Sequence, residues 1–282
     1  MAAISFAIIR VLGNDIPTRH DPNQTYANLD YVLSREENFA DTTKIFCLNR
    51  IVDPDMLTKL KDRLDQAGVQ YWEIPFDKEH YATLRTDDER KHYLTNVNPA
   101  RNMCLDMPAI RADYRVLLDG SVFLTPDGWF QIEDMVYQHR NQEVMGCAVC
   151  RVDSIEELES PKFVPNIKEA YGWGNSQVVS SREPYLIFKD GCEDRFDESL
   201  TYGKADKAEL LYRLGVPGFW DRWEPLLRSE ALRKPSPNFG TVTLGGYAVR
   251  LPSYTHGGGG GNNRQRGADR KKGLQLFVES LR

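Results

Sequence analysis

Hydrophobic runs and amphipathic stretches alternate along the first half of the chain. Short apolar runs typical of buried strands are each followed by a stretch with apolar residues at helical spacing. The expected strands are residues 4–12, 44–51, 69–75, 114–120 and 143–152. The expected helices end near residue 35 or span residues 53–68, 98–110 and 126–140. Strands separated by helix-length connections predict an α/β fold, with a mainly parallel sheet flanked by helices on both faces.

Local signals mark the ends of two of these helices. Residues 53–68 have an acidic first turn, and Gly68 stands at their end as a stop signal. Residues 98–110 begin with Asn98, a residue type that caps helices, and Pro99, which suits the first helical position. We therefore expect Asn98 to be the N-cap of its helix.

The alternation becomes irregular after residue 152. Two further helices are expected at 204–215 and 219–232, a strand at 241–251, and an amphipathic last helix at 268–281. Five glycines follow His256 and form the low-complexity part of the chain. Because glycine gives the backbone its widest conformational freedom, we expect a flexible loop there.

The composition indicates a globular chain with an acidic balance. The 282 residues, 41% hydrophobic and 11% aromatic, are sufficient for a substantial core. The net charge of -5 argues against a nucleic-acid partner, since a broad phosphate-binding surface needs a basic domain. A small phosphorylated ligand is compatible with this balance.

Cysteine usage and the first residues bear on the location of the protein. The five cysteines are odd in number and lie mostly in apolar runs, which suits a reducing compartment. Cys147 and Cys150 form a C-x-x-C without a second pair or a nearby histidine, so we expect buried thiols there. The apolar residues 4–12 lack a basic leader and are fewer than the about 20 needed to span a membrane. We expect no transmembrane segment and a cytoplasmic location.

Three chemically suggestive stretches follow one another in the sequence. Ala100-Arg101-Asn102 opens an expected helix, the apolar run 114–119 ends in Asp119, and residues 195–215 read RFDESLTYGKADKAELLYRLG. Parallel sheets bind ligands at the carboxyl ends of their strands, where Asp119 is expected. Asp119 either begins an Asp-Gly turn or holds a cation for a ligand, and the run itself leaves both open.

This succession resembles the nucleotide-sugar glycosyltransferases of the GT-A fold, especially the large inverting family with ARN, DxD and FDE...ED...L..R...G motifs. The resemblance covers roughly residues 5 to 215. It implies a Rossmann-like GT-A sheet with a helical and loop-rich C-terminal part. It also implies a nucleoside diphosphate sugar donor, a glycan or glycoconjugate acceptor, and Mn²⁺ or Mg²⁺. The enzyme would then be a hexosyl- or pentosyltransferase, and inversion follows only from the family.

The resemblance assigns roles to individual residues. Asp119 matches the first aspartate of the metal motif, while Ser121 stands in place of the second, so a hydroxyl, water or remote side chain must complete the metal site. Arg101 matches the ARN arginine near the donor. Asp206 matches the aspartate that acts as general base, with Ala205 where the family has glutamate.

Other residues compete for these roles. Asp197 and Glu198 are alternative bases, and Asp206 could simply complement the dipole of its helix. His256 is a third metal ligand or an exposed loop residue. Arg264 and Arg266 are candidates to bind the diphosphate as residues 256–266 close over the donor, or they belong to a solvated basic segment.

The loop after the first strand is expected to line the nucleotide base, and its candidate residues are Arg10, Asn14 and Asp15. Trp173, between two glycines, is a candidate to stack on a sugar ring. We expect a single GT-A domain over residues 1–282. Residues 1–125 would form the nucleotide-binding half, 126–255 the acceptor half, and 256–282 the glycine-rich loop and last helix.

Two other functions stay open on the sequence. A sugar nucleotidyltransferase would share the sheet, but it needs a glycine-rich phosphate loop after the first strand, where this chain has only Gly13. A carbohydrate-binding pseudoenzyme would keep the fold without its metal site, and Ser121 is the residue that favours it.

Overall fold

The computed structural model describes most of the chain. The described residues are 3–18, 20–165, 171–174, 177–180, 183–200, 207–218, 220, 235–252 and 263–282. Within 171–174, 177–180 and 263–267 the description is of the backbone alone.

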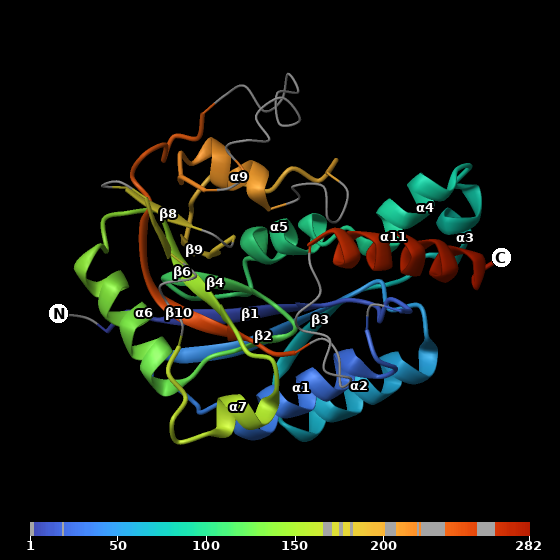
Figure 1. Ribbon diagram of the computed structural model, residues 1–282, viewed down its shortest axis with the longest axis horizontal. Coiled ribbons are helices and arrows are strands. Elements are labelled where there is room, and N and C mark those ends of the chain that lie inside the picture. The colour runs from blue at the N-terminus through green and yellow to red at the C-terminus, as the bar shows by residue number, and fades with distance from the viewer. Residues whose placement is uncertain are drawn as a thin grey trace.

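An eight-stranded sheet forms the centre of the molecule (Figure 1). Its strands are β1 (Phe6–Leu12), β2 (Thr42–Asn49), β3 (Gln70–Ile74), β4 (Tyr114–Asp119), β5 (Val122–Phe123), β6 (Val144–Arg151), β9 (Tyr185–Lys189) and β10 (Thr243–Arg250). The strand order is β3-β2-β1-β4-β9-β6-β10-β5. β9 and β5 are antiparallel to their neighbours, and the other pairings are parallel. The expected α/β fold with a mainly parallel sheet is therefore confirmed. A separate pair, β7 (Tyr171–Gly174) and β8 (Gln177–Ser180), is antiparallel.

Helices cover both faces of the sheet, α5 and α9 on one and α1, α2 and α6 on the other (Figure 1). Their bounds are α1 (Gln24–Arg35), α2 (Pro54–Gln66), α5 (Asn98–Asp106), α6 (Pro126–Gln138) and α9 (Ala208–Arg213). β1 shows why both faces need cover, because all seven of its residues are buried. Ile9 belongs to the core cluster that includes Cys104 of α5, and Ile8 to the cluster that includes Trp129 of α6. Such a doubly buried strand matches the nearly continuous apolar run of its sequence.

The helix ends follow local chemistry at α2 and depart from it at α5. Asp53 caps α2 by accepting from the backbone N of Asp55 at 2.9 Å, and Gly68 follows with a φ of 63°. The predicted stop at Gly68 is confirmed, because this backbone conformation favours glycine. The predicted N-cap at Asn98 is wrong. The N-cap is Val97, and the amide of Asn98 is instead used in contacts described below.

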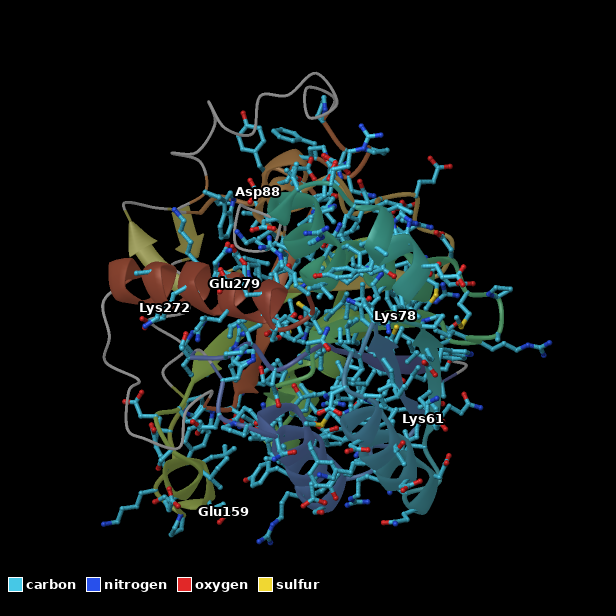
Figure 2. All side chains as sticks on the ribbon, turned by 90° about the vertical axis from the view of Figure 1, so that its right-hand side faces the viewer. Lys61, Lys78, Asp88, Glu159, Lys272 and Glu279 are labelled. Carbon is cyan, nitrogen blue, oxygen red and sulfur yellow. The ribbon has the colours of Figure 1, made fainter. Side chains whose placement is uncertain are left out.

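Several short elements were not predicted from the sequence. They are α3 (Lys78–Thr83), α4 (Asp87–Thr95), α7 (Ile155–Glu159), β5 and β9. The last helix, α11 (Asn263–Glu279), begins before the predicted residue 268. It packs beside α4 through Val278, which shares a core cluster with Tyr81 and Leu94 (Figures 1 and 2). The helix predicted at 219–232 lies outside the described residues, apart from Trp220.

The fold bears on two expectations from the sequence, the state of the cysteines and the presence of a transmembrane helix. All five cysteines are buried and free, so Cys147 and Cys150 are core thiols of β6, as predicted. Within the described part of the chain, no helix has the length and apolar character needed to cross a membrane.

Candidate functional site

The candidate site lies where β4 and β10 end. Asp119 is the last residue of β4, and the backbone N of Gly120 donates to the carbonyl of Val11 at 3.0 Å, so the chain turns at this point. The carbonyl of Ser121 then accepts from the backbone N of Leu251 at 2.8 Å. This bond holds the end of β10 beside the turn and places Arg250, the last residue of β10, close to Asp119.

Asp119 gathers side chains from three other elements. Its Oδ1 accepts from the guanidinium of Arg101, on α5, at 2.9 Å. Its Oδ2 accepts from the hydroxyl of Tyr185, the first residue of β9, at 3.0 Å. The guanidinium of Arg250 lies 3.6 Å from the same oxygen. Asp119 thus begins a turn, as one reading of the Asp-Gly pair predicts, and the cations that its carboxylate contacts are side chains of the protein.

Lys207 adds a third positive charge to this group. It is the N-cap residue of α9, it is buried, and its Nζ lies 4.1 Å from the centre of the Tyr185 ring. Such a contact stabilises an ammonium group over an aromatic face. We call Arg101, Lys207 and Arg250 the basic cluster.

The electrostatics of the cluster keep Asp119 ionised. Burial alone would raise the pKa of Asp119, but the positive charges of the basic cluster, Lys207 first, outweigh this effect and lower the pKa below its usual value. Burial lowers the pKa of Lys207, and the charge of Asp119 acts in the opposite direction. The Asp119 carboxylate therefore stabilises the charged form of the lysine.

The cluster holds more positive than negative charge. Within the described part of the chain, three cations face the carboxylate of Asp119, and Glu183 and Arg151 add one charge of each sign. Arg101 and Arg250 expose 8% and 20% of their side chains, and Asp119 exposes 28%, so solvent and ligands reach the cluster. Guanidinium groups suit phosphate oxygens because they can donate two parallel hydrogen bonds. The arrangement can bind a small, multiply charged anion.

The described residues around Asp119 do not fit a divalent metal. Mn²⁺ and Mg²⁺ prefer several oxygen ligands, and each oxygen of Asp119 already uses one of its two lone pairs in a hydrogen bond with a protein donor. Within the described ranges, no group of three or more His, Cys, Asp or Glu residues could hold a metal ion. Ser121 lies at the turn, and His256 is outside the described residues. Among the described residues one carboxylate faces three nearby cations, and these cations repel a divalent ion.

Asparagines at the start of α5 fix the backbone of residues 196 and 197. The amide of Asn98 donates to the carbonyl of Asp197 at 2.8 Å. The amide of Asn102 donates to the carbonyl of Phe196 at 2.9 Å, and the backbone N of Phe196 donates back to Asn102 at 2.9 Å. The helix that carries Arg101 therefore also positions the FDE stretch.

The same network joins this stretch to the basic cluster. Asn98 accepts from the guanidinium of Arg101 at 2.8 Å, and Phe196 lies under that guanidinium, 5.1 Å from ring centre to carbon. Because Arg101 in turn contacts Asp119, two hydrogen bonds connect Asp119 to Asn98. Asp197 and Glu198 are thereby placed on the same face of the sheet as the cluster.

The candidate bases differ in what they already bind. The carboxylate of Asp197 accepts from the backbone N and the hydroxyl of Ser199 at 2.8 and 2.6 Å, so it stabilises its own turn. Glu198 is exposed, and its Oε1 accepts from Asn102 at 2.9 Å. Asp206 lies outside the described residues, directly before Lys207 of the cluster. Of the two described carboxylates, Glu198 is the more available to an acceptor.

The loop after β1 uses its polar residues to hold the structure together. The amide of Asn14 donates to the carbonyl of Arg50 at 2.8 Å and accepts from the backbone N of Val52 at 2.8 Å. Asp15 accepts from the backbone N and hydroxyl of Thr25 at 2.9 and 2.6 Å, and burial raises its pKa. Both residues join neighbouring loops at the carboxyl edge of the sheet.

Arg10 takes no part in the site, in contrast to its expected place beside the nucleotide base. It is fully buried within β1, it pairs with Glu36, and its Nε donates to the carbonyl of Val122 at 2.9 Å. Successive residues of a strand point to opposite faces, and Ile9 and Val11 face α5. Arg10 therefore points away from Arg101.

Four further candidates cannot be located in this way. His256 lies outside the described residues, and the side chains of Trp173, Arg264 and Arg266 are not described. Their roles stay predictions.

Three residues of the site were missed by sequence reasoning. Arg250 ends the apolar strand β10 just as Asp119 ends β4, and that pattern could have identified it. Lys207 directly follows the predicted base Asp206. Tyr185 has no such signal, because its contact depends on the insertion of β9 between β4 and β6.

Comparisons with known proteins give only distant similarities. No protein-family model matches the chain, and no curated protein matches it. Among solved structures it is similar to S. aureus TarS, at 10% identity and a TM-score of 0.44, over 74% of this chain and 34% of TarS. It is also similar to TarS 1-349 in complex with UDP, at 10% identity and a TM-score of 0.43, over 74% of this chain and 54% of that one.

A third similar structure is glucosyl-3-phosphoglycerate synthase from Mycobacterium tuberculosis in complex with Mg²⁺ and UDP, at 9% identity and a TM-score of 0.40. There the match covers 98% of this chain and 79% of the other. This chain spans about a third to just over half of the TarS chains that it matches. Similarities this distant do not assign an activity or a ligand.

Proposed function

We propose that the protein is a glycosyltransferase that moves a sugar from a nucleoside diphosphate sugar to a hydroxyl group of a glycan or glycoconjugate. The observation that carries this proposal is the basic cluster around Asp119, at the carboxyl ends of β4 and β10. Open α/β sheets bind ligands at this edge. A diphosphate is a small, multiply charged anion that matches the positive excess of the cluster.

The chemistry of glycosyl transfer makes two demands on such a site. The departing nucleoside diphosphate gains negative charge as the bond to the sugar breaks, and fixed positive groups lower the energy of that state. Arg101 and Arg250 are held in place to do this by their contacts with Asp119. Because the cluster is partly shielded from water, its charges act more strongly than they would in solution.

The second demand is a base that accepts the proton of the acceptor hydroxyl. We propose Asp206 for this role, as the family resemblance implies, because it directly precedes Lys207. Glu198 is the described alternative, since the amide of Asn96 donates to its carbonyl and the amide of Asn102 to its side chain. A base that activates the hydroxyl from the side opposite the leaving group inverts the sugar carbon, which is the outcome we expect.

The test is a panel of uridine, guanosine, cytidine and thymidine diphosphate sugars. A donor bound to the folded state alone adds about 2.7 kcal/mol of stability at one hundred times its dissociation constant, so a true donor raises the melting temperature. Release of nucleoside diphosphate that increases with added acceptor glycans would support transfer. If no sugar nucleotide is bound or consumed, the proposal is wrong.

The same assay distinguishes the two rival functions. A carbohydrate-binding module would bind a glycan without releasing any nucleotide. A nucleotidyltransferase would form pyrophosphate from a sugar phosphate and a nucleoside triphosphate. Neither outcome is expected for a glycosyltransferase.

A further inference from the structure

We infer that the basic cluster binds the diphosphate of the donor directly, in the role that a divalent metal was expected to fill. On this inference, which rests on the proposed function, Arg101, Lys207 and Arg250 supply the positive charge. Asp119 is a positioning residue that orients them, and donor binding requires no Mn²⁺ or Mg²⁺.

The contacts of Asp119 are those of a positioning residue. Oδ1 accepts from Arg101 at 2.9 Å and Oδ2 accepts from Tyr185 at 3.0 Å, with Arg250 at 3.6 Å from Oδ2. Each carboxylate oxygen has two lone pairs, and on each oxygen of Asp119 one of them is already used by a protein donor. Displacing those donors would leave a buried guanidinium without its counter-charge, which is unfavourable.

The charge balance favours an anion over a cation. Among the residues that the structure describes, the charged groups that act on the site are the basic cluster and Arg151 on the positive side, and Asp119 and Glu183 on the negative side. The sum is positive by two charges, from four cations and two carboxylates. The two ionised phosphates of a sugar nucleotide would neutralise this excess, while a divalent metal would add to it.

The geometry also brings the cations from separate elements to one place. Arg101 comes from α5, Lys207 from the residue before α9, and Arg250 from the end of β10. Each is buried or nearly so, with Lys207 held over the ring of Tyr185. Cations fixed in this way need little rearrangement when charge develops on the leaving group.

The decisive measurement is the binding of UDP, GDP, CDP and dTDP by calorimetry, once with EDTA and once with MnCl₂. We expect the nucleotide that binds best to have dissociation constants that agree within about threefold in the two buffers, a difference of under 1 kcal/mol. Binding tightened by Mn²⁺ by about tenfold or more would overturn the inference.

Two substitutions test the cations themselves. Lys207→Met and Arg250→Met each remove one charge while keeping an unbranched side chain, and each should weaken nucleotide binding in EDTA by about tenfold or more. The matched control is Lys61→Met. Lys61 lies on α2, on the opposite side of the sheet, and pairs with Glu73 at 2.5 Å (Figure 2). The control should bind nucleotide with wild-type affinity. If Lys207→Met and Arg250→Met also bind with wild-type affinity, the inference is overturned.

Asp119→Asn separates a positioning residue from a metal ligand. On our inference nucleotide binding in EDTA persists in this variant, and added Mn²⁺ does not change it. Binding that is lost and then restored by excess Mn²⁺ would identify Asp119 as a metal ligand and overturn the inference. Melting curves of each variant without ligand show whether it is folded.

The outcomes also separate this inference from the proposed function. If a nucleoside diphosphate binds only with Mn²⁺, the proposed function stands and the inference is wrong. If none binds in either buffer, both are wrong.

Discussion

Arg101 and Asp119 are 18 positions apart in the chain, and their side chains form a hydrogen-bonded ion pair of 2.9 Å. The pair joins the start of α5 to the end of β4, the two stretches that stand out in the sequence. Arg101 also donates to Asn98, so the same guanidinium connects the cluster to the FDE stretch. The Arg101 side chain thus contacts Asp119, at the proposed site of the leaving group, and Asn98, which holds the stretch proposed to lie near the acceptor.

Replacement of Arg101 tests this connection. Arg101→Met should lower the free energy of unfolding by about 1–3 kcal/mol, since it leaves charged and polar partners without a donor. It should also weaken nucleotide binding by about tenfold or more. Urea denaturation and calorimetry measure the two effects.

The control for this variant is Arg63→Met. Arg63 pairs with Asp30 at 2.7 Å between α2 and α1, on the opposite side of the sheet, and Asp30 is half exposed. An exposed pair contributes about 1 kcal/mol or less, and no change in nucleotide binding is expected. If both variants bind nucleotide equally well, Arg101 is only structural.

The general base is tested by Asp206→Asn and Glu198→Gln. We expect Asp206→Asn to lower kcat by about 10² to 10⁴ with nearly normal donor binding, as for the loss of a general base. Glu198→Gln should lower kcat by less than about tenfold, because the amide keeps an oxygen for Asn102. Single-turnover rates at saturating donor give the comparison, and a reversed order would assign the base to Glu198.

Two glycines with a positive φ distinguish the cost of backbone strain from the cost of a steric clash. Gly191 has a φ of 80° with open space around its missing Cβ, while Gly246 has a φ of 65° and would bring a Cβ to 2.7 Å from the backbone N of Ile132. Gly191→Ala should cost about 1 kcal/mol of stability from backbone strain alone. Gly246→Ala should cost about 1–3 kcal/mol more, because α6 must shift. Equal midpoints in urea would contradict this packing argument.

The cysteines should be unreactive in the folded protein. Burial raises the pKa of Cys147 to about 12 and that of Cys192 to about 11, and the thiolate is the reactive form. We expect none of the five thiols to react with Ellman's reagent at pH 8 in the native state, and all five in guanidinium chloride. A thiol that reacts rapidly without denaturant would show that its region opens.

The sequence predicts best what depends on neighbouring residues. The apolar run of β1 and the stop at Gly68 are local, and both were predicted correctly. Asn98 was misjudged because its amide bonds to Asp197, 99 positions away, instead of capping its own helix. Arg10 was expected beside the nucleotide base, yet the fold buries it and supplies Glu36 as its partner.

The site residues also differ in whether a local sequence signal or a long-range contact identifies them. Asp119 and Arg101 could be singled out because each ends or opens an element. Arg250 could have been singled out in the same way, because it ends β10. Lys207 and Tyr185 could not, since their proximity depends on the antiparallel entry of β9 between β4 and β6. Only the order of strands in the sheet brings them within reach of Asp119.

That strand order has a consequence for the newly made chain on the ribosome. β6 gains its parallel neighbour only with β10, and β5 pairs with β10 alone, although β5 is made more than a hundred residues earlier. Strands that wait unpaired are exposed to wrong partners during synthesis, so their early masking by chaperones would favour correct folding. Of the basic cluster Arg250 is made last, which means that a nascent chain has no complete anion site until β10 has left the exit tunnel.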